Sequence, residues 1–386
     1  MSLYQRKLRM GMIGGGTGAF IGAVHRLAAN LDGQIELVCG AFSSDPNKSK
    51  QTGEELFLDP SRVYGSYLEM IEKEASLPDD LRMDFVSIVT PNHVHAEPAM
   101  LALDHGFSVM IDKPLCFNYA EALAIKKKVE ETGLLLGLTH TYTGYPMVKE
   151  ARQIIKSTKL GSVRKVVMEY PQGWLAEKLE DSDQKQAAWR TDPLKSGKSG
   201  AYGDIGTHAT NMGEYVTGLK ITKVLSQLNT VVTGRLLDDD ANAFVEFEGG
   251  IPGILSISQI SAGEENAIKV RVYCEKGGIY WTQRDPNTLN IMSNDGPDEV
   301  YRTGTSYVSK AAQVNSRTPA GHPEGYLEAF ANIYRNFVMH LRAKSEGKDH
   351  DFELYDYPGI DDGVHGMRLV DAFVESTQLG NTWINV

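Results

Sequence analysis

The chain has 386 residues, which is longer than one hydrophobic core usually supports, so two domains are expected. Apolar residues make up 41% and charged residues 23%, as in ordinary globular proteins, and the formal net charge is −11. This acidic balance, with no compensating basic tract, disfavours nucleic acid and anionic membrane surfaces as partners. The three cysteines are few and unpatterned, and they indicate neither a disulfide framework nor a zinc site.

Neither an export signal nor a membrane segment is expected. Residues 1–9 are partly basic, but no apolar stretch follows them, so no signal peptide is predicted. The sequence holds no run of about 18 apolar residues that could cross a membrane. We therefore expect a cytoplasmic protein in a reducing compartment.

A strand, a glycine-rich turn and a helix are predicted at the start of the chain. Residues 8–13 have the pattern of a short buried strand, and a helical pattern follows the turn. In the pattern G-x-G-x-x-G/A, the first glycine makes a tight turn, the second lets the backbone approach a pyrophosphate, and the third small residue allows close helix packing. The segment therefore predicts a dinucleotide-binding turn. The residues expected to line it are Gly14, Gly16, Thr17, Ala19 and Phe20.

The second expected strand, residues 35–42, ends without the acidic residue that NAD-specific folds place there for the ribose 2′-hydroxyl. Ser43, Ser44, Asp45 and Lys48 stand at and beyond that position. Ser43 with Lys48 could hold the 2′-phosphate of NADP, whereas Asp45 could serve NAD. The same residues also fit a Ser-Asp-Pro turn that caps the next helix. The choice between NAD and NADP is left open.

Further expected strands at residues 85–89, 108–111 and 134–138 alternate with helical patterns, which predicts a doubly wound parallel sheet. Ligands of such sheets gather at the carboxyl ends of the strands. His93 could bind a metal together with His95, but no carboxylate or thiolate accompanies them, so no metal is predicted. The residues expected near the cofactor at these strand ends are Thr90, Pro91, Asn92, His95, Asp112 and Lys113.

Lys113 follows a strand end directly, where a lysine is more often a solvated surface residue. The following Pro114 restrains the turn. An ammonium at this edge of the sheet could polarise a substrate hydroxyl.

The alternation of strands and helices stops at about residue 142. Strand patterns at residues 163–170, 223–232, 242–247, 254–259, 267–273 and 278–283 follow one another through short turns, which predicts an open, mainly antiparallel sheet. The expected fold class is therefore α/β, with an N-terminal Rossmann doubly wound sheet over residues 1–141 and a C-terminal α+β domain over residues 142–386. A second subunit is expected to cover one face of the C-terminal sheet, giving a homodimer or homotetramer.

Asp204 and His208 stand four residues apart in a stretch crowded with glycines, which places both side chains on one face of a helix. A histidine beside a carboxylate is suited to proton transfer near neutral pH. Gly206 between them costs about 1 kcal/mol relative to alanine in a helix. We expect a flat nicotinamide ring to press against the backbone at this glycine. Without further support, the pair also fits a solvated helix face.

These segments resemble the glucose–fructose oxidoreductase/inositol dehydrogenase family, called Gfo/Idh/MocA. Four landmarks fall in the family's order, at residues 14–19, 90–95, 112–114 and 203–208, and the resemblance covers almost the whole chain. Asp112 stands where the family has a glutamate. Trp189 and Arg190 resemble a Trp-Arg pair of the family.

The resemblance implies an NAD(P)-dependent oxidoreductase that interconverts a secondary alcohol and a ketone on a sugar, a sugar derivative or a cyclic polyol. It makes Lys113, Asp204 and His208 the catalytic residues, and it adds Trp189 and Arg190 to the cofactor residues. Ser43 with Lys48 resembles the NADP-holding arrangement of some members. The candidate substrate contacts are His140, Tyr142, Gln172, Trp174, His322 and Tyr326.

Two other functions stay open. Some relatives are glycoside hydrolases that use a tightly held NAD for transient oxidation of the sugar, and the fold also hosts non-catalytic NAD(P)-binding sensors. The joint presence of Lys113, Asp204 and His208 argues against a sensor.

Overall fold

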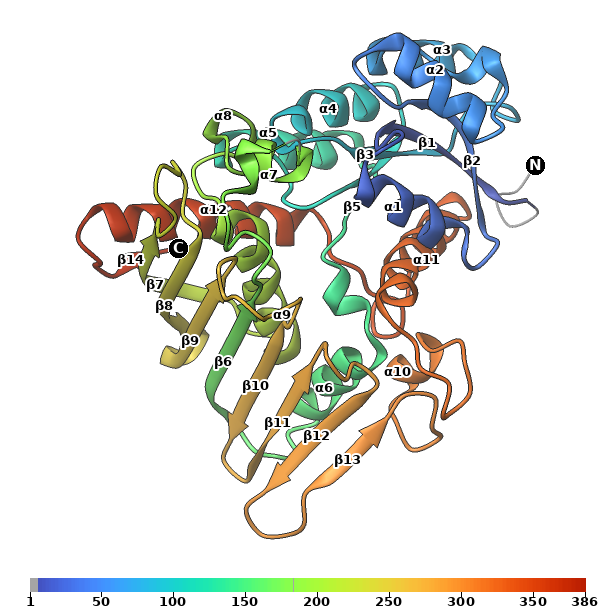
Figure 1. Cartoon of the computed structure of the whole chain (residues 1–386). Helices are drawn as coiled ribbons and strands as arrows, with labels where there is room; N and C mark the ends of the chain where they lie inside the picture. Colours follow the sequence, from blue (N-terminus) through green and yellow to red (C-terminus); the bar gives the residue numbers. More distant parts are fainter. Residues whose placement is uncertain (1–5, 183) are drawn as a thin grey trace. The chain divides into compact units, whose positions relative to one another are not determined.

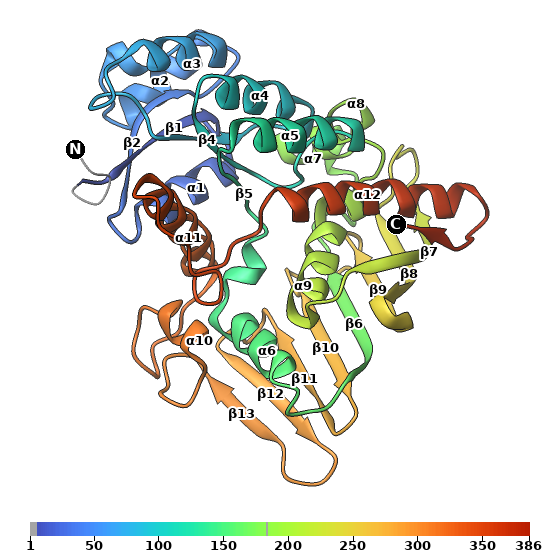
Figure 2. The ribbon, with the colours of Figure 1, turned by 180° about the vertical axis from the view of Figure 1, so that it is seen from behind.

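The computed structural model describes residues 6–182 and 184–386, and its elements are shown in Figures 1 and 2. Residues 1–5, on which part of the signal-peptide expectation rests, lie outside the described residues. The chain divides into two compact units. The first holds the residues up to Thr141 together with Tyr326–Val364, and the second holds Tyr142–Gly325 and His365–Val386.

The first unit contains, within its described residues, a five-stranded parallel sheet in the order β2-β1-β3-β4-β5. Strands β1, β3 and β4 are buried on both faces, and their side chains are accordingly mostly apolar, whereas the edge strand β2 exposes Glu36. The predicted doubly wound sheet is thus confirmed. The strands are β1 (Leu8–Gly14), β2 (Ile35–Ala41), β3 (Phe85–Val89), β4 (Ser108–Ile111) and β5 (Leu136–Leu138). The helices between them are α1 (Phe20–Asn30), α2 (Pro46–Glu55), α3 (Tyr67–Ser76), α4 (Ala96–Asp104) and α5 (Tyr119–Thr132).

Helix α11 (Tyr326–Ser345) also belongs to the first unit, where it packs beside α1 (Figure 1). Its buried side chains Phe330, Tyr334 and Phe337 join Met10 and Phe85 of the sheet in one hydrophobic cluster. The predicted second domain, residues 142–386, is therefore too long, because the second unit lacks residues 326–364. Residues 326–364 return to the first unit because α11 buries its apolar face in that core.

A buried polar network joins α11 to the sheet. The Tyr334 hydroxyl lies 2.6 Å from His25 Nδ1 and 2.7 Å from Ser87 Oγ, and all three residues are fully buried. His25 Nε2 lies 3.5 Å from Asp112 Oδ1, which also accepts a 2.8 Å hydrogen bond from the Thr139 hydroxyl. The network therefore links α1 and α11 to the ends of β4 and β5.

The second unit contains, within its described residues, a nine-stranded sheet in the order β13-β12-β11-β10-β6-β9-β8-β7-β14. Strands β6 and β9 pair in parallel, and the other neighbours pair antiparallel, as the short turns predicted. The strands are β6 (Val163–Pro171), β7 (Ile221–Asn229), β8 (Asp240–Phe247), β9 (Ile251–Ser258), β10 (Lys269–Cys274), β11 (Gly277–Thr282), β12 (Thr288–Ser293), β13 (Glu299–Arg302) and β14 (Ile384–Asn385).

Helices α6 and α9 contact each other and cover one face of this sheet (Figure 2). Gly213 of α9 lies directly against Met168 of β6, because a Cβ at Gly213 would come within 2.3 Å of the methionine sulfur. Among the described residues, no helix combines the length and the apolar character that crossing a membrane requires. The remaining helices are α6 (Pro146–Lys156), α7 (Lys185–Arg190), α8 (Pro193–Ser196), α9 (Thr207–Thr217), α10 (Lys310–Val314) and α12 (Ile360–Gln378).

The Asp112 carboxyl makes a pH-dependent contribution to stability. Burial alone raises its pKa, but His25, the charge of Lys113 and the Thr139 hydroxyl outweigh burial, so the pKa lies well below its usual range. A folded-state pKa below the unfolded value stabilises the protein above the unfolded pKa of about 3.9, and this contribution is lost as the pH falls below that value.

We therefore expect Asp112→Asn to lower the unfolding midpoint by several degrees at neutral pH, and by progressively less below about pH 4. Thermal melts of both proteins across this range test the expectation. Asp104→Asn, at an exposed ion pair with Lys128, serves as a control with little effect at any pH. A deficit of equal size at every pH would show that Asp112 acts through packing alone.

Candidate active site

The carboxyl ends of the strands in the first unit bring several predicted segments to one edge of the sheet. Gly14 pairs with Val89, and Ile111 pairs with Ile88 and Leu138 in the parallel register. The glycine turn, the Thr90 turn and the Asp112–Lys113 corner therefore leave the sheet at the same edge. This is the edge at which parallel sheets bind ligands.

The glycine turn has the geometry of a phosphate cradle. Gly14 and Gly18 have φ angles of 76° and 84°, which favour glycine. A Cβ at Gly16 would lie 2.8 Å from the Phe42 carbonyl oxygen, whereas a Cβ at Gly18 would meet nothing within 4 Å, so the Gly18 side of the turn is open. Ala19 provides no side-chain cap for α1, and the amides of the first helical turn remain suited to an anion. These residues fit a dinucleotide pyrophosphate.

The close packing of α1 against the turn depends on Gly22 and not on Ala19, to which the sequence pattern assigned it. A Cβ at Gly22 would lie 2.1 Å from the Gly15 carbonyl oxygen. Only a glycine at this position allows such an approach. The available signal was a glycine inside the helix, where it costs about 1 kcal/mol relative to alanine.

The residues after β2 form the helix-capping turn that the sequence allowed. The Asp45 carboxylate accepts a 2.9 Å hydrogen bond from the Asn47 amide, and Pro46 begins α2. Ser43 Oγ accepts a 3.1 Å hydrogen bond from the Asp45 amide. Ser44 and Lys48 are exposed. The capping role leaves the choice between NAD and NADP undecided.

His95 links two turns at the edge of the sheet. Its side chain is fully buried, with Nε2 lying 2.8 Å from the Thr90 carbonyl oxygen and Nδ1 lying 2.9 Å from that of Pro114. Burial lowers the pKa of His95, while the charge of Asp112 and the carbonyl oxygens oppose this shift. The geometry thus gives His95 a role in positioning the Lys113 corner. Asn92 is also buried, whereas His93 is exposed.

The first unit also contains four other predicted site residues. Lys113 follows β4 and is partly exposed, and His140 follows β5 and is buried. Tyr326 begins α11, where its ring packs edge-on against Phe330. Phe20, at the start of α1, is 70% exposed, which is unusual for a phenylalanine and leaves its ring available to a ligand on the glycine turn.

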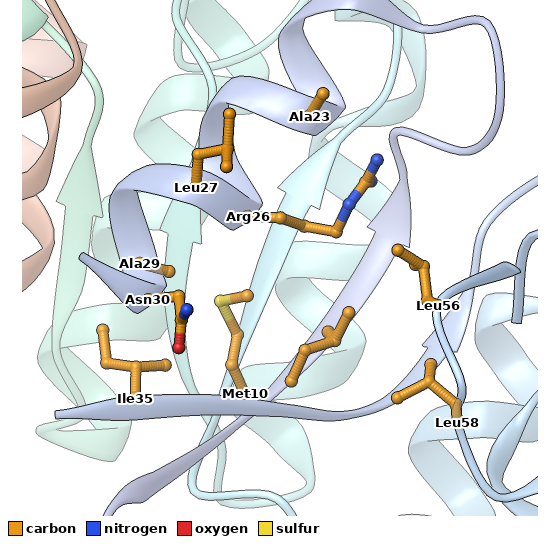
Figure 3. Close-up of a pocket in the computed structure, with 10 residues that line it drawn as sticks. Met10, Ala23, Arg26, Leu27, Ala29, Asn30, Ile35, Leu56 and Leu58 are labelled. Carbon is orange, nitrogen blue, oxygen red and sulfur yellow. The ribbon is translucent and has the colours of Figure 1, made fainter. Parts of the chain in front are cut away.

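A pocket of about 460 Å³ lies between α1, β2 and the segment after α2 (Figure 3). Its walls are mainly aliphatic side chains such as Leu27, Ile35 and Leu58, with Arg26 extending toward the glycine turn. Arg26 Nη1 donates a 2.6 Å hydrogen bond to the Gly15 carbonyl. The pocket thus lies behind the turn, beside the start of β2, and not at the carboxyl edge.

In the second unit, Asp204 and His208 lie on consecutive helical segments. Asp204 belongs to a π-helical turn, Tyr202–Gly206, and His208 to the first turn of α9. Asp204 Oδ2 accepts hydrogen bonds from Arg190 Nε at 3.2 Å and from Gln259 Nε2 at 2.8 Å. The predicted residues Arg190 and Asp204 are therefore brought together. The sequence analysis did not identify Gln259, because a single glutamine after a strand belongs to no recognisable motif.

The glycine at position 206 has an explanation inside the protein. A Cβ there would lie 2.2 Å from Cδ2 of Tyr202, whose ring stacks on Phe373 at a centroid distance of 3.7 Å. This contact accounts for the glycine without the nicotinamide ring that the sequence analysis expected there. Gly206 makes room for the buried Tyr202 ring one turn earlier.

Asp238 anchors the start of this helical segment. Its carboxylate accepts hydrogen bonds from Ser199 Oγ at 2.8 Å, from the Gly200 amide at 2.7 Å and from the Tyr202 amide at 2.9 Å. Burial raises the pKa of Asp238, although these hydrogen bonds oppose the shift. The sequence analysis did not single out this residue, although three consecutive aspartates at positions 238–240 were a visible signal.

His208 adjoins a hydrogen-bonded group of polar side chains. Its ring meets the Tyr142 ring edge-on at a centroid distance of 4.9 Å. The hydroxyls of Tyr142 and Tyr170 are hydrogen-bonded to each other. Asn266 accepts a 2.7 Å hydrogen bond from the Tyr170 hydroxyl and donates one of 3.2 Å to Tyr142. Asn266, a single amide in a polar turn, was not foreseen.

Two further predicted substrate residues join this group. Gln172 Nε2 donates a 2.5 Å hydrogen bond to Asn266 Oδ1, and Trp174 Nε1 donates one of 3.1 Å to Gln172 Oε1. Arg190 Cζ lies 6.0 Å from the ring centroid of Trp174 and 4.3 Å from that of Trp189. His322 is exposed, and its Nδ1 lies 3.2 Å from the Pro319 carbonyl oxygen. Within residues 6–182 and 184–386, no group of three or more metal-ligating side chains occurs.

Gly206→Ala is expected to destabilise the second unit by about 1–3 kcal/mol, because the new methyl group overpacks the Tyr202 ring. Gly203→Ala is the matched control, since a Cβ there would meet only Ser199 Cβ at an ordinary 3.8 Å. Thermal or urea unfolding of both variants measures the difference. If Gly206→Ala melted like the wild type but lost cofactor binding, the nicotinamide explanation would be restored.

Comparisons with known proteins agree with this architecture. The model of the oxidoreductase family with an NAD-binding Rossmann fold matches residues 8–140, and the model of the GFO/IDH/MocA C-terminal domain matches residues 148–280. An uncharacterized oxidoreductase of Bacillus subtilis, YfiI, is 32% identical over 99% of this chain and 98% of its own length.

Solved structures of oxidoreductases are also similar to this chain over nearly its whole length. An oxidoreductase from Sinorhizobium meliloti is 44% identical, with 98% and 100% of the two chains covered and a TM-score of 0.88. An inositol dehydrogenase homolog from Azotobacter vinelandii, in its complex with NAD+, is 33% identical, with 99% and 98% covered and a TM-score of 0.94. The same homolog complexed with NADH and myo-inositol is 32% identical, with 100% and 99% covered and a TM-score of 0.91. The chain therefore belongs to the GFO/IDH/MocA family of oxidoreductases, with an NAD-binding Rossmann domain followed by the family's C-terminal domain.

Proposed function

We propose that this protein is an NAD(P)-dependent dehydrogenase that interconverts a secondary alcohol and a ketone on a cyclic polyol, a sugar or a sugar derivative. The observation that carries the proposal is the position of His208 beside the hydrogen-bonded side chains of Tyr142, Tyr170 and Asn266. An ionisable imidazole next to several hydroxyl and amide groups suits a substrate that carries many hydroxyls. The A. vinelandii homolog, complexed with NADH and myo-inositol, supports the substrate class.

The proposed roles of the residues follow from their chemistry. His208 takes the proton of the reacting hydroxyl and returns it in the reverse reaction. Lys113 stabilises the developing alkoxide with its ammonium group. Asp204, held by Arg190 and Gln259, aligns His208 or a neighbouring substrate hydroxyl. The bound nicotinamide supplies the hydride acceptor.

The proposed cofactor contacts lie at the carboxyl edge of the first unit. The glycine turn would hold the pyrophosphate, and Lys113 would stand at the nicotinamide end. Asp45, His95 and Asp112 are proposed to position this edge. Asp45 caps α2, His95 contacts the carbonyl oxygens of Thr90 and Pro114, and Asp112 lies beside the buried His25. The residues proposed to touch the cofactor are Gly14, Gly16, Thr17, Ala19, Phe20, Ser43, Ser44, Thr90, Pro91 and Asn92. In the second unit, Trp189 and Arg190 are proposed to support Asp204.

In this proposal the first unit binds the cofactor, and the second binds the substrate and forms the oligomer. The sheet face opposite α6 and α9 carries a cross-strand row of Leu225, Phe244, Ile254 and Val167. Phe244 is 57% exposed there. Such an apolar row on an open sheet suits a second copy of the chain, in a homodimer or homotetramer. The sparse, unpatterned cysteines suit the cytoplasm.

A panel of cyclic polyols and sugars assayed with NAD and with NADP tests the function, with reduced nicotinamide followed by absorbance. We expect turnover with at least one cyclic polyol or sugar. Cofactor binding without turnover across a broad panel would contradict the proposal and favour a sensor. Cleavage of a glycoside with no net change in the cofactor would favour the hydrolase.

His208→Ala is expected to lower kcat by about 10²–10⁴-fold, because it removes the proton acceptor, while the affinity for the dinucleotide changes little. Steady-state kinetics and calorimetric titration with the cofactor measure the two effects separately. His105→Ala is the matched control, since this histidine lies at the end of α4, on the amino-terminal side of the sheet. Full activity of His208→Ala would overturn the assignment of the proton acceptor.

A further inference from the structure

Helix α2 reaches the glycine turn through two of its side chains. Thr52 Oγ1 accepts a 3.1 Å hydrogen bond from the Thr17 amide. The Thr17 hydroxyl donates a 2.6 Å hydrogen bond to Glu55 Oε2. Thr52 and Glu55 are three residues apart and thus share one face of the helix. The Glu55 carboxylate is therefore held at the residue that directly follows the second glycine of the turn.

The second oxygen of this carboxylate is held as well. Glu55 Oε1 accepts a 2.9 Å hydrogen bond from Gln51 Nε2. The hydrogen bonds from Thr17 and Gln51 lower the pKa of Glu55, so the group is a carboxylate near neutral pH. The side chain is exposed to solvent while it is bound to Thr17 of the turn.

The end of β2, by contrast, has a serine and not an acid at the customary place. Ser43 stands there, and its hydroxyl accepts a hydrogen bond from the Asp45 amide. Asp45 itself caps α2 by accepting a hydrogen bond from the Asn47 amide. An NAD-specific fold uses a carboxylate to accept hydrogen bonds from the adenosine ribose and to repel a 2′-phosphate. In this chain the carboxylate that is tied to the glycine turn by a side-chain hydrogen bond comes from α2.

We propose that Glu55 is a specificity-determining residue that favours NAD over NADP, in place of the acid missing after β2. The proposal rests on the proposed function in one respect, namely that the dinucleotide lies on the glycine turn. The 2′-phosphate of NADP adds a charge of about −1.5 to −2, which an adjacent carboxylate repels. The 2′-hydroxyl of NAD carries no charge and can donate a hydrogen bond to the same group.

Isothermal titration of the full-length protein with NAD and with NADP tests the proposal without requiring turnover. We expect Glu55→Gln, which retains an acceptor for Thr17, to raise the affinity for NADP relative to NAD by about tenfold. Glu54→Gln is the matched control, because it removes the same charge from the neighbouring exposed position of α2. If the ratio of NADP affinity to NAD affinity were the same in Glu55→Gln and Glu54→Gln, the proposal would be overturned. An equal loss of affinity for both cofactors in Glu55→Gln would also overturn it.

Two further measurements separate this proposal from its alternatives. In the wild type, raising the salt concentration from about 0.1 M to about 1 M should reduce the difference between the affinities for NAD and NADP. The reason is that the Debye length falls from about 10 Å to about 3 Å, so the repulsion between Glu55 and the 2′-phosphate is screened. If Lys48→Gln moved the ratio and Glu55→Gln did not, Ser43 and Lys48 would be the selecting pair and the proposal would fail. If neither NAD nor NADP bound the wild type, both the proposed function and the proposal for Glu55 would fail. If NAD bound and Glu55→Gln left the ratio of the two affinities unchanged, only the proposal for Glu55 would fail.

Discussion

Helix α1 lies so close to the turn before it that the contact leaves no room for a side chain. The steric limit at Gly22, against the Gly15 carbonyl, sets the position of the helix and hence of the amides in its first turn. One turn further along the same helix, His25 reaches Tyr334 and Asp112 in the buried network. A single helix thus relates the glycine turn, where a pyrophosphate fits, to the strand that precedes Lys113. Helix α11 completes this arrangement, although it follows the turn by about 300 residues of chain.

In the second unit, a buried carboxylate fixes the position of the helical segment that carries Asp204 and His208. Asp238 holds the amides at the start of the helical segment, and the π-helical turn that follows places Asp204 where Arg190 and Gln259 can bind it. Insertions of this kind in helices are frequent at functional sites, because they re-aim side chains without ending the helix. His208 then lies in the regular part of α9, where the Tyr142 ring restricts its orientation. Both units therefore hold their ionisable residues through rigid elements.

Much of the fold could be predicted from the sequence. The alternation of apolar runs and helical patterns was sufficient for the parallel sheet, and the short turns between later strands were sufficient for the antiparallel one. The membership of α11 could not be predicted, because an amphipathic pattern shows that a helix buries one face and not which core receives it. Candidate site residues could be proposed from the sequence where several residues form a pattern, as at Asp204 and His208. Gln259, Asn266 and Glu55 stand alone in the sequence, and only tertiary contacts relate them to the site.

In the proposed reaction, a carbinol carbon of the substrate gives its hydrogen, as hydride, to the nicotinamide. The most direct measurement uses a cyclic polyol or sugar accepted by the enzyme, deuterated at each carbinol carbon in turn, with magnetic resonance of the recovered cofactor. We expect one labelled position to transfer deuterium to C4 of the reduced nicotinamide, in step with ketone formation. Ketone formation with no deuterium on the cofactor, from any labelled position, would contradict it.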